Sequence, residues 1–68
     1  MTTVEIAAAI VVVREGLPGL PENRRRQVVN MLVGIADTMV AGGEDGEEVF
    51  DFLRFMCCTA ENGAVGHA

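Results

Sequence analysis

The chain has 68 residues, half of which are hydrophobic, and its formal net charge is −5. A chain this short forms one domain at most and buries only about 60% of the surface that it exposes when unfolded. The acidic balance disfavours generic attraction to nucleic acid or to anionic lipid.

Small folds usually need disulfides, a metal ion or a second subunit for stability. The two cysteines, Cys57 and Cys58, are adjacent and cannot join distant segments, and the only histidine is His67, near the C-terminus. We therefore expect oligomerisation, with no metal and no cofactor. The cysteine pattern is typical of a reducing cytoplasm. The longest apolar run, residues 6–13, is far shorter than the about 20 residues of a membrane span, so we expect no membrane contact.

The first predicted element is a helix over residues 3–15. Thr2 and Glu5 have the spacing of a capping box. Gly16 is expected to end the helix in the left-handed conformation, and Pro18 to prevent its continuation. The β-branched run of residues 10–13 would also suit a strand, but the preceding alanines and the end signals favour a helix. This helix is apolar nearly all round, which predicts burial.

The second predicted helix spans residues 21–41, with Pro21 as its first residue and a Gly-Gly pair after its end. Two adjacent apolar rows run along it: Val28, Leu32, Ile35 and Met39, and Val29, Val33, Ala36 and Val40. Together they cover an arc of roughly 200°, which is wider than the apolar stripe of an ordinary surface helix.

The third predicted helix spans residues 46–61, with Asp45 and Glu48 in cap positions. Its apolar face consists of Val49, Phe52, Leu53, Met56 and Ala60. Asn62 and Gly63 are expected to end it, which leaves residues 62–68 as a flexible tail.

The sequence thus predicts an all-α fold, with residues 1–68 as a single helical domain of three helices. Each helix has more apolar surface than one partner within the chain can cover, so we expect a helical homodimer with twofold symmetry. The predicted interface consists of Ile6, Ile10, Val13, Val28, Leu32, Ile35, Met39, Phe52 and Phe55.

Three consecutive arginines, Arg24, Arg25 and Arg26, lie at the start of the second helix. Cations there oppose the helix dipole, and Glu22 offsets this only in part. The cluster either binds phosphate or carboxylate on another molecule, or pairs with acids of the protein itself. We favour the second interpretation, with Glu15 or residues 44–51 of a second subunit as partners.

Two further surfaces are candidates for partner binding. An acidic cluster opens the third helix, where it would form either a docking patch or a solvated first turn. The polar side of the second helix is rich in amides and nearly uncharged, with Gly34 at its centre. The predicted partner-binding residues are Asn23, Arg24, Arg25, Arg26, Gln27, Asn30, Glu44, Asp45, Glu47 and Glu48.

No catalytic pattern is present, because neither charged cluster has a histidine near it in sequence. The leading hypothesis is a small acidic, non-enzymatic homodimer that binds and modulates another protein as a regulator or inhibitor. Compact accessory proteins of bacteria and phages have this general build. One alternative is a nucleic-acid-binding regulator that uses Arg24–Arg26. A second is a carrier of a small apolar ligand, with a pocket lined by Phe50, Phe52, Phe55 and Met56.

Overall fold

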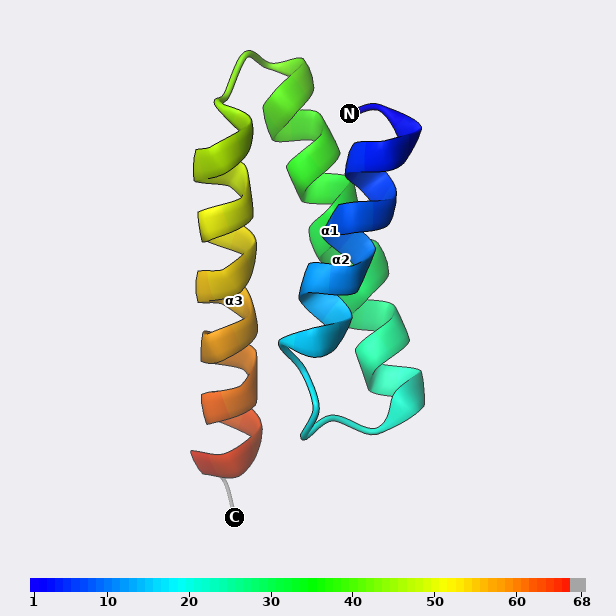
Figure 1. The fold of residues 1–68 in the computed structure, drawn as a ribbon. Helices are drawn as coiled ribbons and strands as arrows, with labels where there is room; N and C mark the ends of the chain where they lie inside the picture. The colour runs from blue at the N-terminus through cyan, green and yellow to red at the C-terminus, as the bar shows by residue number, and fades with distance from the viewer. Residues whose placement is uncertain (67–68) are drawn as a thin grey trace.

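The computed structural model describes residues 1–66, with side chains for residues 1–62. Three helices pack together: α1 (Thr3–Glu15), α2 (Glu22–Ala41) and α3 (Gly46–Gly66). Figure 1 shows α2 running antiparallel to both other helices, with α1 in front of α2 and α3 beside them, and each pair of helices is in contact. The three predicted helices are confirmed, and none of those described is both long and apolar enough to span a membrane.

The end of α3 differs from the prediction. The helix continues past Asn62 to Gly66, so most of the predicted tail has helical backbone. The end signal at residues 62 and 63 was weak, because asparagine and glycine lower helix propensity without terminating a helix by themselves. Residues 67 and 68 lie outside the described residues.

The start of α1 is the predicted capping box. The backbone amide of Glu5 donates to Oγ1 of Thr2 at 3.2 Å, and the amide of Thr2 donates to Oε1 of Glu5 at 2.8 Å. These bonds satisfy two amides that have no partner within the helix.

The end of α1 corrects the prediction for Gly16. Its φ is −81°, in the right-handed region, so the left-handed conformation is not the reason for glycine here. A Cβ atom at this position would lie 2.8 Å from Cβ of Cys57 on α3. Glycine instead allows α1 and α3 to approach closely, a tertiary requirement that local sequence signals do not contain.

The boundaries of α2 are set by Pro21 and by the Gly-Gly pair. Pro21 is the N-cap and not the first helical residue, and its carbonyl accepts from the amide of Arg25 at 2.8 Å. At the other end Gly43 has φ of +101°. The amide of Gly43 donates to the carbonyl of Val40, and the amide of Glu44 donates to the carbonyl of Met39, both at 3.0 Å. This pair of bonds is a Schellman motif with glycine at C′.

The linker between α1 and α2 is fixed to the bundle. Leu17 is fully buried in the core. The amide of Gly19 donates to Oε1 of Glu61 on α3 at 2.8 Å, while Oε2 of Glu61 is buried without a hydrogen-bond partner. A Cβ at position 19 would lie 2.8 Å from that oxygen, so this contact depends on glycine.

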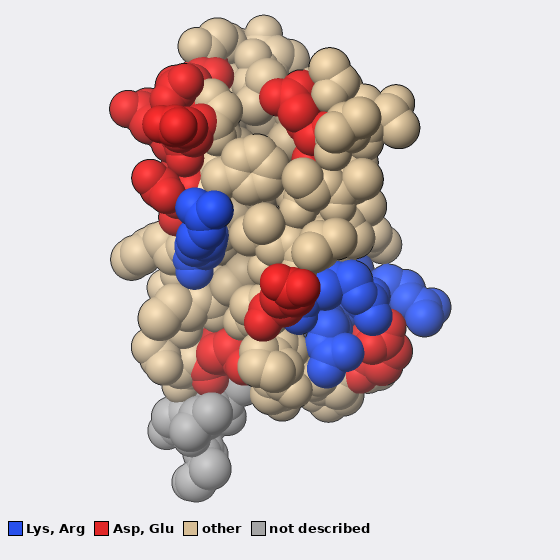
Figure 2. Space-filling view, in the orientation of Figure 1, with Lys and Arg blue, Asp and Glu red and all other residues tan. Residues whose placement is uncertain are grey.

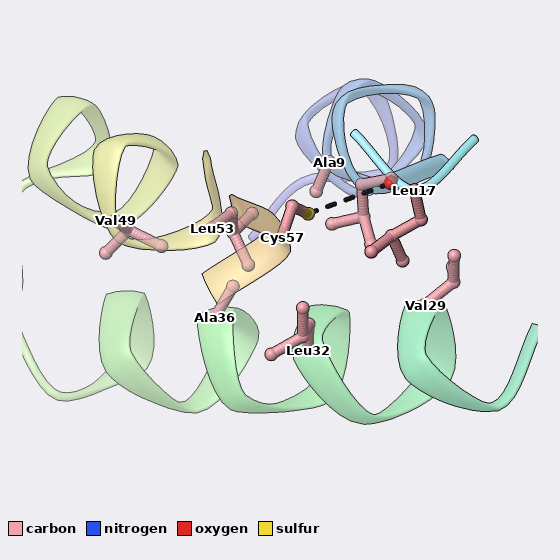
Figure 3. Packing of buried hydrophobic residues seen from close by; sticks show 9 residues of the cluster. Ala9, Leu17, Val29, Leu32, Ala36, Val49, Leu53 and Cys57 are labelled. Carbon is pink, nitrogen blue, oxygen red and sulfur yellow. Dashed lines mark hydrogen bonds between the residues drawn. The ribbon is translucent and has the colours of Figure 1, made fainter. Parts of the chain in front are cut away.

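The core is aliphatic and small, and all three helices contribute to it (Figure 3). Its buried members are Ala9, Val13, Leu17, Val29, Leu32, Ala36, Val49, Leu53 and Cys57. Val13 and Leu32 were predicted to form a dimer interface, and this is corrected: both are inside the single chain, where no partner can contact them. Within one chain α1 buries only Ala9 and Val13, so it is not surrounded on all sides as its composition suggested.

Candidate interaction surfaces

Arg25 holds the linker between α1 and α2. Its guanidinium donates from Nε to the carbonyl of Leu17 at 3.0 Å and from Nη2 to the carbonyl of Leu20 at 2.9 Å. Both carbonyls lie in the linker and lack a partner within a helix. Arg25 is only 22% exposed. Although we predicted that Arg25 binds a partner, its donors are used inside the chain.

Glu22 is the shared ion-pair partner of three arginines. Its carboxylate accepts from Nη2 of Arg14 at 3.0 Å and from Nη1 of Arg25 at 2.8 Å, and it lies 3.9 Å from Nη2 of Arg26. The hydrogen bond from Arg14, followed by the charges of all three arginines, lowers the pKa of Glu22. The carboxylate that pairs with the arginines is therefore Glu22 and not the expected Glu15. Glu22 contacts two members of the triplet, Arg25 and Arg26.

Arg24 has a different environment from its two neighbours. It is exposed and forms no ion pair with an acidic side chain among residues 1–62. Arg26 is exposed as well, but it lies beside Glu22. The triplet is therefore not one basic patch, although Figure 2 shows basic side chains gathered around the start of α2.

The acidic cluster lies at the other end of the bundle, over the start of α3 (Figure 2). Glu44, Asp45, Glu47, Glu48 and Asp51 are all exposed. Asp51 accepts from Arg54 at 2.9 Å. The carbonyl of Asp45 accepts from the amide of Val49 at 3.0 Å. The acidic and basic clusters therefore do not meet within one chain.

The amide-rich side of α2 is open. Asn23, Gln27 and Asn30 are exposed. A Cβ at Gly34 would meet nothing within 4 Å, and the hydroxyl of Thr38 donates back to the carbonyl of Gly34 at 3.0 Å. We call Asn23, Gln27, Asn30 and Gly34 the amide strip. No other part of the described chain covers Gly34, so the strip is open to close approach.

A second open surface is apolar and lies on α2 and α3, away from α1. The positions of this α2/α3 face on α2 are Arg24, Val28, Met31, Ile35 and Met39, and those on α3 are Glu48, Phe52, Phe55 and Thr59. They recur at spacings of three and four residues, so on each helix they form one row.

Contacts with Met1 and Val13 show which side of α2 and which side of α3 face the N-terminal part of the chain. The N-terminal amine of Met1 donates to Asp37 of α2 at 2.6 Å, and the thiol of Cys57 on α3 donates to the carbonyl of Val13 at 3.7 Å. Ile35 precedes Asp37 by two residues, and Phe55 precedes Cys57 by two. At 3.6 residues per turn, Ile35 lies about 160° around α2 from Asp37, and Phe55 lies about 160° around α3 from Cys57. Both side chains therefore point away from α1.

The exposed fractions of the apolar side chains agree with a face that points away from α1. On the α2/α3 face Met31 is 55% exposed, Ile35 40% and Phe55 67%. Val28, Met39 and Phe52 are half-buried and pack against the core. Charged residues of the face occur only at its ends, as Arg24 and Glu48.

The predicted interface residues are distributed over three places. Val28, Ile35, Met39, Phe52 and Phe55 lie on the α2/α3 face, Ile6 and Ile10 lie on α1, and Val13 and Leu32 are in the core. Met31 also lies on the α2/α3 face, but it is not among the predicted interface residues. The spacing of four and three residues from Arg24 through Val28 to Met31 could have identified it.

The outer side of α1 is a smaller apolar surface. Val4, Ala7, Ala8 and Val11 are exposed along it and form what we call the α1 strip. Figure 2 shows a band without charged side chains at this position. None of these four residues was predicted as a contact residue.

The three phenylalanines do not line a common pocket. Phe50 borders a shallow depression with Glu47, Asp51 and Arg54. Phe52 and Met56 pack against the core, whereas Phe55, in the same row of α3 as Phe52, is exposed to solvent. The pocket predicted from Phe50, Phe52, Phe55 and Met56 is therefore not formed in this structure.

The cysteines differ in accessibility. Cys57 is buried, and desolvation, with a smaller effect of Glu61, raises the pKa of its thiol. Cys58 is exposed, and both are free thiols. Among the residues that the structure describes, histidine, cysteine and carboxylate side chains form no group suited to a metal ion. His67 lies outside the described residues.

No family model, curated protein or solved structure matches this chain.

Proposed function

We propose that this chain is a non-enzymatic interaction protein that acts as a helical homodimer and binds and modulates another protein. The observation that carries the proposal is the α2/α3 face, which exposes Met31, Ile35 and Phe55 together. No aromatic side chain is buried in the core of residues 1–62. Large apolar side chains placed outside rather than inside a small fold mark an interaction site.

The use of the titratable groups supports a non-enzymatic role. Glu22 is occupied by arginines, and Glu61 accepts from the linker. Cys57 is buried with a raised pKa, which disfavours the reactive thiolate. These groups stabilise the fold and are not held beside an open cavity, where a catalytic group would need to be.

For the modulated protein we propose the amide strip as the contact surface. It is exposed and free of charge, and Gly34 leaves room for close approach of another backbone. Arg26 lies on the same helix and is 71% exposed. We place this activity in the cytoplasm, because free Cys57 and Cys58 suit a reducing compartment.

Self-association is tested by sedimentation equilibrium at micromolar concentration. We expect a mass of twice the 7.2 kDa of one chain. The mass of a single chain up to high micromolar concentration, with full helicity, would contradict the homodimer.

Binding of another protein is tested by affinity capture from cells of the native host. Asn30→Arg changes the amide strip, and Ala8→Arg places the same charge on the α1 strip as the matched control. We expect a captured protein that is lost with Asn30→Arg and retained with Ala8→Arg. Equal capture by both variants, or none by the wild type, would contradict this part of the proposal.

Nucleic-acid binding makes a different prediction. It requires affinity that falls steeply with salt and that is lost in the double variant Arg24→Ala, Arg26→Ala. Arg25 is excluded from this test because it holds the linker. A gel shift with these properties would replace the proposal of a protein partner.

A further inference from the structure

We propose that the α2/α3 face is covered by a second copy of the chain in an antiparallel arrangement, with Arg24 of each copy at the same end of the dimer as Glu48 of the other. This inference rests on the proposed homodimer and adds its surface and geometry. It is derived from the places of the two charged residues and of the apolar residues between them.

The two ends of the face carry opposite charges. Helices α2 and α3 are antiparallel, so the start of α2 and the start of α3 lie at opposite ends of the bundle (Figure 1). Arg24 is therefore at one end and Glu48 at the other. Along α2 the face extends 15 residues from Arg24 to Met39, or about 22 Å. This exceeds the screening length of about 8 Å at physiological salt, so the charges do not neutralise each other within one chain.

A twofold dimer brings the same face of both copies together. If the copies run parallel, Arg24 lies near Arg24 of the partner copy, and the two Glu48 residues share the other end. If they run antiparallel, each end of the dimer holds one Arg24 and one Glu48. Opposite charges at an interface steer association and fix its orientation, and like charges oppose it. The charge pattern therefore selects the antiparallel dimer.

The apolar residues fit the same symmetry. Met31 follows Arg24 by seven residues, and Phe55 follows Glu48 by seven. Met31 and Phe55 are the two most exposed apolar side chains of the face. Each lies about 10 Å along its helix from the charged residue at the start of that helix, which places both near the middle of the face. An antiparallel twofold axis through the middle brings Phe55 of the two copies together beside the flexible thioethers of Met31. Aromatic and thioether side chains adapt well to such a contact.

The size of the surface is also adequate for a second copy. A standard interface buries about 800 Å² per partner, which is about one fifth of the 4441 Å² that this chain exposes. One side of a three-helix bundle supplies an area of that order. The α1 strip is a poorer candidate, because Ala7 and Ala8 offer little area and no charged pair marks its ends.

The first experiment locates the surface. Met31→Glu and, independently, Phe55→Glu place a charge on the α2/α3 face, and Val11→Glu places one on the α1 strip. Dimer dissociation constants are measured by sedimentation, with helical content checked by circular dichroism. We expect an increase of more than about 30-fold for the first two variants, as for a central interface residue, and little change for Val11→Glu. A dimer that is insensitive to both face variants would overturn the surface while leaving the homodimer intact.

The second experiment determines the orientation. We expect Arg24→Glu and Glu48→Arg each to raise the dissociation constant about tenfold at low salt, and the double variant to restore it. Arg26→Glu and Glu47→Arg, on other sides of the same helices, are the matched controls. In a parallel dimer Arg24→Glu exchanges one like-charged pair for another. A dimer that is lost with Met31→Glu but unchanged by Arg24→Glu would therefore overturn the antiparallel arrangement alone. A wild-type monomer would overturn the proposed homodimer as well.

Discussion

Gly16 and Gly42 both follow the last residue of a helix, and both have φ of −81°. Their surroundings differ: a Cβ at Gly16 would lie 2.8 Å from Cβ of Cys57, whereas at Gly42 the nearest atoms are carbonyl oxygens at an ordinary 3.5 Å. We expect Gly16→Ala to lower the free energy of unfolding by about 1–3 kcal/mol through overpacking. Gly42→Ala, the matched control, should change it by less than about 0.5 kcal/mol. Urea unfolding measures both, and equal effects would show that α1 and α3 do not approach this closely.

Arg25 and Arg26 are neighbours with unequal roles. A lysine at position 25 keeps the charge but has no planar fork to reach the carbonyls of Leu17 and Leu20 together. We expect Arg25→Lys to lower the free energy of unfolding by about 1–2 kcal/mol. Arg26→Lys should be within about 0.5 kcal/mol of the wild type, because the side chain is exposed. If the two substitutions cost the same in thermal unfolding, Arg25 does not hold the linker.

At the scale of helices and turns, the connection from α2 to α3 depends on Gly43. Its φ of +101° is in the region that side chains with a Cβ rarely adopt. We therefore expect Gly43→Ala to destabilise the chain by about 1 kcal/mol or more. Gly46→Ala, three residues later in open space, should be neutral or slightly stabilising, because alanine is the better helix former. A neutral Gly43→Ala in chemical unfolding would contradict the Schellman motif.

The ion pairs of Glu22 join α1 to α2 and make stability dependent on pH. The pKa of Glu22 is lowered in the folded chain, first by the hydrogen bond from Arg14. The folded state therefore favours the ionised carboxylate, which stabilises the fold above the ordinary glutamate pKa of about 4.3. This contribution is lost as the pH falls through the lowered value.

We expect Glu22→Gln to be less stable than the wild type at pH 7, and the difference to shrink below about pH 4. Denaturant midpoints between pH 7 and pH 3 measure this, with the exposed Glu15→Gln on α1 as the control. A constant difference between wild type and Glu22→Gln over this range would show that the ionised carboxylate is not what stabilises the fold.

Local signals in the sequence predicted the helices well. The Thr2–Glu5 capping box and the Gly-Gly pair act through neighbouring atoms, and both are present as hydrogen bonds. The role of Gly16 could not be found in this way, because it depends on Cys57, 41 residues later. Similarly, helical spacing placed Leu32 and Ile35 on one apolar face. Only packing against α1 and α3 separates the buried Leu32 from the exposed Ile35.

The candidate surfaces were predicted only in part, because some of their features depend on neighbouring residues and others on contacts that form only in the fold. Exposure of the acidic cluster follows from its position at a helix start, which the sequence contains. The separation of Arg24 from Arg25 does not, because Arg25 turns to carbonyls of the linker that only the fold brings near. The spacing of Met31 from Val28 places it in the same row of α2, but only the fold shows that α1 leaves this row uncovered.

For the molecule as a whole, a homodimer links stability to protein concentration. If the second copy binds only the folded chain, mass action raises the unfolding temperature as concentration increases. We expect the midpoint of thermal unfolding to rise by a few degrees for each tenfold increase in concentration. Ile35→Glu on the α2/α3 face should remove this dependence, whereas Val11→Glu on the α1 strip should retain it. A midpoint independent of concentration in the wild type would indicate a monomer.

The two connections of the bundle differ in how they tolerate engineering. Residues 16–21 have the glycines and prolines of a flexible spacer, yet Leu17 is buried, Gly19 is bound by Glu61 and two carbonyls are held by Arg25. A tag or a new chain terminus placed there would remove contacts from all three helices. The turn at residues 42–45 is exposed and makes only backbone hydrogen bonds among the described residues. Fluorescent reporters and affinity tags therefore belong at that turn, after Glu44, where both hydrogen bonds of the Schellman motif are kept.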